Sequence, residues 1–241
     1  RQEAIEEIKR DILDEEHFKV EFLEQFEEQI EKSLSFFHDY KQINAQIRQN
    51  INVVIENRYD GSEFEEKLTE ATRSERAIYE AARFLDEKLN VAKFLVDPQW
   101  LHISSECTKF KVHGMVLKYA KIYESWFKDR NISLKIIGES YNEIVANPEA
   151  CSVIPHTFLD NALKYAPADS KVEVYIDDRG GRVHFEVGSY GPELAAGEER
   201  DIFRAFFRGE AAKEISDEGA GYGLYVSQLV AKEHLGVQVG V

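Results

Sequence analysis

Apolar residues recur at steps near three and four along the first 57 positions, which is the spacing of one face of an α-helix. Charged runs such as EEIKRDILDEE border this stripe, as they do on the outside of a coiled coil. The spacing slips between Glu15 and Val20, where a kink or stutter is expected. We therefore predict one long helix over residues 1–57.

The segment NRYDGS at 57–62 has Asp-Gly at its centre and is typical of a turn. Ser62 could cap a second helix, and Glu65 follows three residues later, as in a capping box. Two long helices joined by a short turn pack antiparallel, and this hairpin carries more apolar surface than it can cover alone. We predict a homodimer in which two hairpins form a four-helix bundle. The apolar positions of the second helix are Phe64, Leu68, Ala71, Ile78, Ala82, Leu85 and Leu89.

The composition changes at Asp97-Pro98, so we predict a coiled coil and helical hairpin over 1–97 and a second domain over 98–241. The pattern of the second domain predicts an α+β fold with helices stacked on one face of a mixed sheet. Its predicted elements are strands at 109–115, 132–139 and 235–241, helices at 116–130 and 151–166, a β-hairpin at 171–189 and a short helix within 198–209.

Composition narrows the classes of function. The 241 residues carry a net charge of -15, which argues against nucleic acid as the main partner, because no broad positive surface would attract phosphates. Neither a membrane-spanning apolar run nor a signal peptide is visible. Cys107 and Cys151 have no metal-ligand spacing and fit a reducing compartment. Because the chain starts at Arg1, we expect a cytoplasmic fragment, with any membrane anchor in preceding segments.

The segment FLDNALKYAP sets Asn161 and Lys164 three positions apart, on one face of a predicted helix. An amide oxygen is a good ligand for a hard divalent cation, and a lysine can hold phosphate charge. The ring of Tyr165 could pack on a purine. Taken alone, these residues fit an ordinary solvent-exposed helix equally well.

Three further segments follow in order. VGSYGPEL (187–194) ends a strand with a turn at Gly191, and IFRAFFRG (202–209) places Arg208 among aromatic residues. The polar stretch EAAKEISDE has the composition of a mobile lid or of an exposed loop. GAGYGL (219–224) then precedes an apolar helix, so its glycines either admit a phosphate to a helix start or make a flexible turn.

The order of these segments resembles the ATP-binding domain shared by sensor histidine kinases, type II topoisomerases, mismatch-repair clamps and a heat-shock chaperone family. DNALKYA resembles the N box, VGSYGPEL the first glycine box and GAGYGL the second. IFRAFFRG resembles the F box, which is particular to the histidine kinase branch. The resemblance covers residues 108–241 and implies an α/β sandwich that binds ATP and Mg²⁺.

By this resemblance, Asn161 binds Mg²⁺, Lys164 binds the phosphates, Tyr165 packs near the adenine and Arg208 reaches the γ-phosphate when a lid closes. The glycine boxes contribute the remaining nucleotide-binding residues, which are Ser189, Gly191, Gly219, Gly221, Gly223 and Leu224.

The first glycine box departs from the family in two places. Ser189 stands where the family has an aspartate that accepts a bond from the adenine amino group. A hydroxyl also accepts a bond but carries no charge, so adenine would be selected less firmly. Glu193 replaces the second glycine of this box, so the turn must differ.

The segment FFHDYKQI lies on the first predicted helix. A neutral imidazole such as that of His38 is a nucleophile near pH 7, and the neighbouring Asp39 could take or orient its other proton. Gln42 lies one turn later, where it could position a water. Alone, this segment also fits a surface histidine among polar residues. Beside an ATP domain it resembles the phosphoacceptor motif of histidine kinases, with Gln42 in place of Asn.

Three hypotheses follow from these segments. In the first, the chain is a histidine protein kinase of a two-component system that autophosphorylates His38 from Mg·ATP and passes the phosphoryl group to a response-regulator aspartate. The second is a kinase-like scaffold or phosphotransfer protein that binds ATP weakly, because of Ser189 and Glu193. The third is an ATP-hydrolysing clamp. Such relatives activate water with a glutamate four residues before Asn161, where this chain has Thr157.

Overall fold

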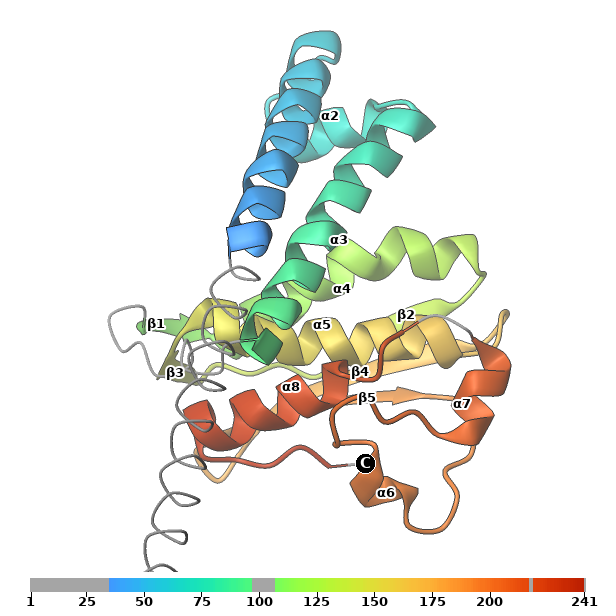
Figure 1. The fold of residues 1–241 in the computed structure, drawn as a ribbon. Coiled ribbons are helices and arrows are strands. Elements are labelled where there is room, and N and C mark those ends of the chain that lie inside the picture. Colours follow the sequence, from blue (N-terminus) through green and yellow to red (C-terminus); the bar gives the residue numbers. More distant parts are fainter. Residues whose placement is uncertain (1–34, 97–106, 217–218, 241) are drawn as a thin grey trace, which may run out of the picture. The chain divides into compact units, whose positions relative to one another are not determined.

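The computed structural model describes residues 35–96, 107–216 and 219–240 (Figure 1). By its contacts the chain divides into two compact units, Arg1–Ile43 and Asn44–Val241. The predicted N-terminal kink and the predicted domain boundary at Asp-Pro both lie outside the described residues. Among the described residues, no helix is long and apolar enough to cross a bilayer.

The helices and strands follow one another much as the sequence pattern predicts, except that residues 112–115 of the predicted strand at 109–115 belong to the next helix. The first described element is a helix over 35–58. The others are α2 (Phe64–Glu70), α3 (Arg73–Val96), β1 (Thr108–Lys111), α4 (Val112–Asp129), β2 (Ser133–Ile137), β3 (Glu143–Ala146), α5 (Pro148–Tyr165), β4 (Lys171–Arg179), β5 (Arg182–Ser189), α6 (Glu198–Asp201), α7 (Glu210–Ile215), α8 (Gly223–Leu229) and the π-helical turn η3 (Val230–His234).

The helix over 35–58 and α3 form the predicted antiparallel hairpin. Near one end, the Asn44 side-chain amide donates to the carbonyl oxygen of Ala82 at 2.7 Å. Near the other end, Arg58 pairs with Glu75 at 2.5 Å. Lower residue numbers on one helix therefore meet higher numbers on the other, which is the antiparallel arrangement.

The second arm of the hairpin is broken into α2 and α3, where the sequence predicted one helix. The predicted capping box of Ser62 and Glu65 is wrong, because α2 has Glu63 as its N-cap and no side-chain cap. The Ser62 hydroxyl instead donates to Glu66 at 3.1 Å. A capping residue must lie directly before the first helical turn, and the chain enters α2 one residue too late for Ser62 to do so.

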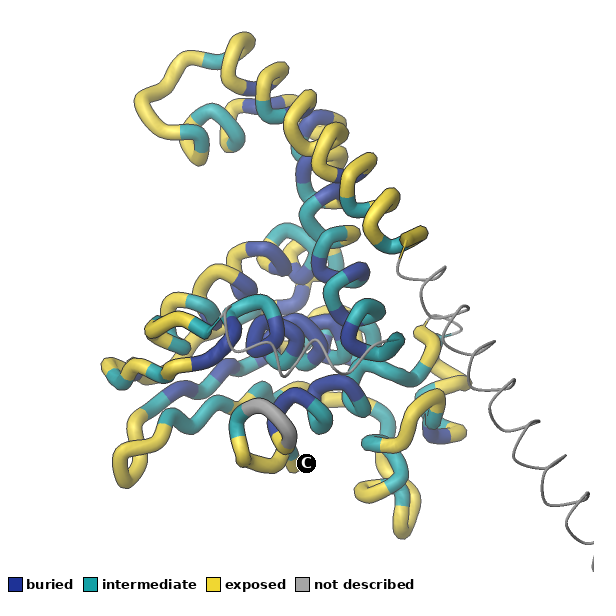
Figure 2. Tube along the Cα trace, turned by 60° about the vertical axis from the view of Figure 1, so that its left-hand side comes forward, coloured by how far each residue is buried: buried dark blue, intermediate teal, exposed yellow. Residues whose placement is uncertain are grey.

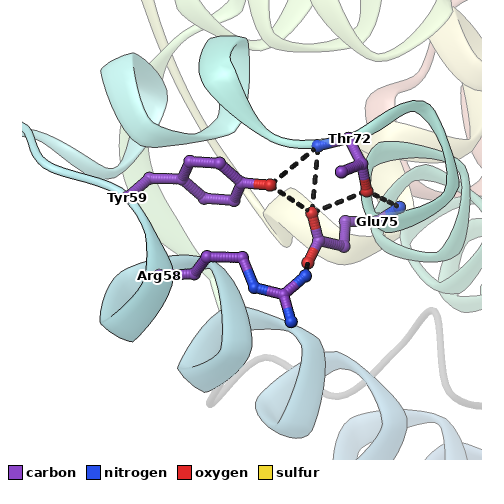
Figure 3. A network of polar contacts seen from close by, with 4 residues as sticks. All are labelled: Arg58, Tyr59, Thr72 and Glu75. Atoms are coloured by element: carbon purple, nitrogen blue, oxygen red, sulfur yellow. Dashed lines mark hydrogen bonds and ion pairs between the residues drawn. The ribbon is translucent and has the colours of Figure 1, made fainter.

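The capping box lies ten residues further on and starts α3 (Figure 3). The Glu75 backbone N–H donates to the Thr72 hydroxyl at 3.3 Å, and the Thr72 backbone N–H donates to the Glu75 carboxylate at 2.9 Å. Tyr59 and Arg58, from the end of the first helix, donate to the same carboxylate. The break in the second arm is therefore a built helix start that ties the two arms together.

The sheet of the second half has the order β2-β4-β5, with β2 parallel to β4 and β4 antiparallel to β5. Gly180 and Gly181 form the hairpin turn with φ of 57° and 77°, the left-handed pair that suits a two-residue connection. A separate antiparallel pair joins β1 to β3, a strand that the sequence analysis did not predict. Its short segment EIVA is too brief to stand out by periodicity.

Helices α4 and α5 pack on one face of this sheet, as predicted (Figure 1). Val172, Val174 and Ile176 alternate along β4 and are buried with Phe127 of α4 and Leu159 of α5. Figure 2 shows burial concentrated where these helices meet the sheet, whereas much of the hairpin is exposed. A second apolar cluster joins α3, α5, α8 and η3 through Val91, Phe94, Ala150, Val153, Val226 and Val230.

Two C-terminal predictions need correction. The predicted short helix within 198–209 covers only α6, which ends at Asp201, and Phe206 in the turns beyond it has a left-handed φ of 64°. The predicted strand at 235–241 is absent over its described part. There Gly236 turns the chain with φ of 65°, and the Val239 N–H donates to the Gln228 side chain at 2.8 Å. The segment thus returns along α8 instead of extending the sheet.

Candidate functional site

A cavity of about 1960 Å³ opens between α5, the end of β5, the segment after α6 and the start of α8. It exceeds the roughly 300–1,000 Å³ of typical small-molecule sites, so a nucleotide would occupy part of it. All of the predicted nucleotide-binding residues line this cavity. They are Asn161, Lys164, Tyr165, Ser189, Gly191, Arg208, Gly219, Gly221, Gly223 and Leu224.

Helix α5 carries Asn161 and is fixed at both ends. Asn147 caps its first turn by accepting bonds from the backbone N–H groups of Glu149 and Ala150, and Pro148 fits the first helical position. At the other end, the Arg130 guanidinium donates to the last carbonyl groups of the helix. Asn161 is half-buried in the last turns of this rigid helix.

The end of β5 brings the first glycine segment to the cavity. Ser189 pairs with Val172 in the β4–β5 register, so it lies on the helix-covered face of the sheet. A Cβ on Gly191 would lie 3.9 Å from the Cβ of Tyr165, which places this turn against the end of α5. Ser189 and Tyr165 thus belong to the same end of the cavity.

The second glycine segment is held by close backbone contacts. Gly221 has a φ of 71°, and a Cβ there would lie 2.5 Å from the Phe207 carbonyl oxygen, so only glycine fits. A Cβ on Gly223 would lie 3.0 Å from a methyl carbon of Thr157. The IFRAFFRG segment, the glycines and α5 therefore pack together without intervening side chains.

A cluster of three charged side chains lies on the cavity wall. Lys88 of α3 and Lys164 of α5 both donate to the same oxygen of Asp160, at 2.5 and 2.6 Å. The Asp160 side chain is only 8% exposed, so its charge depends on these lysines. The Lys164 ammonium also adjoins Gly219, whose Cβ position lies 3.6 Å away.

Ionisation in this cluster reflects a balance of burial and pairing. Burial opposes the charge of Asp160, but Lys88 and Lys164 outweigh it and lower the pKa of the carboxyl. Burial likewise opposes the charge of Lys164, yet Asp160 raises the pKa of this lysine. For Lys88 burial prevails and lowers the pKa.

His156 lies one turn before Asp160 and is 1% exposed. Its Nδ1 lies 2.8 Å from the Tyr123 hydroxyl, while its Nε2 has no hydrogen-bond partner among the described residues. Burial, followed by the charge of Lys88, lowers the pKa of His156 to about 3. The ring is therefore a neutral packing residue.

Arg208 lies with its guanidinium donating to the carbonyl oxygens of Ala212 and Ser216. In this arrangement it holds the end of α7, which occupies the polar stretch considered as a lid or loop. Its predicted contact with the γ-phosphate stays a prediction.

The other predicted constellation lies in the first unit. His38, Asp39 and Gln42 are all exposed on the helix over 35–58. An exposed ring is accessible to a reactant, as a phosphoacceptor must be.

Neither Lys88 nor its pairing with Asp160 is predicted from the sequence. Lys88 lies 72 residues before its partner on another helix. No spacing rule connects such positions, so only the packing of α3 against α5 could reveal the cluster.

Residues 152–241 match the family model described as Histidine kinase-, DNA gyrase B-, and HSP90-like ATPase. Sensor protein kinase PmrB of Pseudomonas aeruginosa is 36% identical over 76 residues, which are 32% of this chain and 16% of that protein. Sensor protein CopS of Pseudomonas syringae pv. tomato is 29% identical over 120 residues, or 49% of this chain and 24% of that protein.

The chain therefore spans at most about a quarter of these relatives. Full-length ShkA in complex with AMPPNP is similar over 80% of this chain and 40% of that one, at 19% identity and a TM-score of 0.47, which adds nothing to the sequence match. The family match falls on the residues that line the cavity from α5 to α8. Residues 152–241 are therefore similar to the ATP-binding domain that histidine kinases share with DNA gyrase B and HSP90.

Proposed function

We propose that this chain is the core of a two-component histidine protein kinase, which transfers the γ-phosphoryl group of ATP to His38. The observation that carries the proposal is the convergence of the predicted nucleotide-binding residues, from four separate segments, on one cavity. From His38 the phosphoryl group passes to an aspartate on a response-regulator receiver domain.

The cavity residues divide the nucleotide between them. The ring of Tyr165 and the hydroxyl of Ser189 hold the base, while Lys164 and the backbone of Gly219, Gly221 and Gly223 hold the phosphates. Leu224 and Gly191 complete the wall of the cavity. Arg208 reaches the γ-phosphate once its guanidinium has released the carbonyl groups at the end of α7.

Asn161 supplies the protein ligand for Mg²⁺. Within the described part of the chain, no three His, Cys, Asp or Glu side chains gather as a metal site. Mg²⁺ is commonly held by few protein oxygens together with substrate phosphates and water, so a single amide on the cavity wall fits it. When bound, the ion would neutralise part of the negative charge of the phosphates.

His38 accepts the phosphoryl group through its unprotonated ring nitrogen. The N–P bond forms as the bond from the γ-phosphorus to the bridging oxygen breaks, and ADP leaves with that oxygen. Asp39 holds the proton on the other ring nitrogen and stabilises the charged imidazole. Gln42 positions water for hydrolysis of the regulator phosphate.

The hairpin dimerises with a second copy of the chain. Ile47 and Val54 lie two turns apart on the first helix, and Ile78 and Leu85 lie two turns apart on α3. Each is more than 40% exposed. A stripe of this kind on both helices is what a four-helix bundle buries.

The clamp hypothesis is not favoured by the residues before Asn161. The position that carries the water-activating glutamate in such relatives is Thr157, which has no carboxylate to act as a base. Thr157 is buried and packs its methyl group against Gly223. Asp160 is paired with two lysines and is not available to take a proton from water.

Nucleotide titration distinguishes the scaffold hypothesis from the kinase hypothesis. Ser189 provides a neutral hydroxyl at the base end, so we expect measurable but weak binding of Mg·ATP. No binding at millimolar Mg·ATP would favour the scaffold over the kinase.

The direct test incubates the chain with γ-labelled ATP. We expect label on the parent, none on His38→Gln, and strongly reduced label on Asn161→Ala. His184→Gln, which changes a partly exposed histidine on β5, should label like the parent. Label that persists on His38→Gln would overturn the acceptor assignment, and equal label on Asn161→Ala would overturn the metal assignment.

A further inference from the structure

The three-charge cluster of Lys88, Asp160 and Lys164 links the hairpin to the nucleotide cavity. Lys88 comes from α3 and Lys164 from α5, and both ammonium groups contact one oxygen of Asp160. All three side chains line the cavity. A helix of the hairpin thus reaches the wall on which Asn161 lies.

The two lysines do not have equal surroundings. Lys88 lies over the ring of Phe84, with its ammonium 4.8 Å from the ring centroid, which provides a second favourable contact at its present position. Lys164 instead adjoins the glycine turn at Gly219. Of the two, Lys164 is the one beside the backbone that would cradle phosphates.

The carboxylate of Asp160 sets the cost of moving Lys164. Asp160 is buried, so a departure of its last cation would leave an uncompensated charge in the protein interior, which is strongly unfavourable. With Lys88 in place, the cluster holds two positive charges and one negative charge. Lys164 can then turn to a phosphate while Asp160 keeps a partner.

We propose that Lys88 is a positioning residue for nucleotide binding, which neutralises Asp160 so that Lys164 can leave it for the nucleotide phosphates. This inference rests on the proposed function, because it concerns the same site. Tight nucleotide binding then depends on the Lys88 charge that α3 brings to Asp160. Lys88 itself touches no substrate.

The test measures binding of AMPPNP with Mg²⁺ by titration calorimetry to the whole chain. We expect Lys88→Met to bind about tenfold more weakly than the parent, because Lys164 is then the only cation on Asp160. Lys88→Arg should bind within about twofold of the parent, since it keeps the charge.

The matched control is Lys93→Met, which removes a second ion pair between α3 and α5 in the described part of the chain, the 3.5 Å contact with Glu149. It should bind like the parent, because Glu149 lies at the far end of α5 from Asn161. A loss equal to that of Lys88→Met would mean that helix docking alone is at work and would overturn the proposal.

The decisive variant combines Lys88→Met with Asp160→Asn. It should recover binding to within about twofold of the parent, because no buried charge is left when Lys164 moves. A purely structural ion pair predicts no recovery, since the double variant lacks the pair altogether. Binding as weak as in Lys88→Met would overturn the proposal.

Two further outcomes keep the test decisive. If Lys88→Met does not fold, Asp160→Asn alone must bind at least as tightly as the parent, because Lys164 is no longer tethered, and weaker binding overturns the proposal. A parent chain that binds no AMPPNP refutes the proposed function itself. A parent that binds, with Lys88→Met equal to it, refutes only the role of Lys88.

Discussion

Glu75 and Asp160 are both buried carboxylates, yet the chain neutralises them in different ways. Glu75 lies in the first turn of α3, where hydroxyl and backbone groups close by provide most of its hydrogen bonds. The hydroxyls of Tyr59 and Thr72 are the main reason that its pKa falls to about 2. Asp160 depends on two ammonium groups, one of them from a helix distant in sequence.

The difference separates a structural carboxylate from an exchangeable one. Apart from Arg58, the donors to Glu75 belong to a helix start and an aromatic ring, so they cannot leave without breaking the turn. The lysines on Asp160 have long flexible stems, so one can exchange its partner for a phosphate. The first arrangement fixes a bend, and the second stores positive charge beside a cavity.

The largest effect on stability is expected from Asp160→Ala. It leaves two ammonium groups facing each other without their carboxylate, and we expect the free energy of unfolding to fall by about 3 kcal/mol. Urea unfolding at pH 7 measures it. Asp201→Ala, which removes an exposed pair with Arg204, should cost less than about 1 kcal/mol. Equal losses of unfolding free energy in the two variants would show that the buried ion pairs of Asp160 contribute no more than an exposed pair.

Acid should weaken the Asp160 region before the Glu75 region. The folded pKa of His156, about 3, lies below its unfolded value of about 6.5. Between these values the unfolded chain binds a proton that the folded chain does not, so stability falls as pH falls. We expect a slope of up to about 1.4 kcal/mol per pH unit.

This slope is measured by urea unfolding at several pH values between 6.5 and 4.5. The slope should be smaller in His156→Gln than in the parent, because the glutamine takes up no proton on unfolding. An unchanged slope in His156→Gln would contradict the buried neutral state.

The capping box of α3 should contribute a smaller amount. Thr72→Ala removes the side-chain acceptor of the Glu75 N–H, and we expect a loss of about 1 kcal/mol. Thr72→Ser keeps the oxygen and should lose less. Ser62→Ala should change the free energy of unfolding by less than about 0.5 kcal/mol, because Ser62 caps no helix. A greater cost at Ser62 than at Thr72 would restore the capping box predicted from the sequence.

The smallest effect is expected at Arg58. Its side chain is 60% exposed, so water and salt screen its pairing with Glu75. We expect Arg58→Ala to change the free energy of unfolding by at most about 0.5 kcal/mol, and less at 0.5 M salt. A larger, salt-insensitive loss in urea unfolding would show that Glu75, like Asp160, depends on a charged partner.

The sequence by itself determined the elements whose signals are local. The hairpin helices, α4, α5 and the β4–β5 hairpin follow from apolar periodicity and turn glycines, because each pattern is complete within its own segment. The order of the four boxes likewise identified the residues that gather at the cavity.

Local signals were misleading where several starts fit the same pattern. Ser62 with Glu65 and Thr72 with Glu75 are equally good capping boxes in sequence, and the bonds to Glu75 from Arg58 and Tyr59 favour the second. The expected C-terminal strand failed for a similar reason. Its alternating residues suit a strand, but Gly236 and the Gln228 side chain turn it back along α8.

Only the tertiary structure decided the pairing of Lys88 with Asp160. Packing of apolar residues between α3, α5 and α8 brings α3 against α5. Lys88 on α3 therefore lies beside Asp160 on α5. Contacts between distant segments depend on how whole elements pack, which no short window of residues encodes. For that reason the cavity residues could be predicted from the chain, whereas the lysine that accompanies them could not.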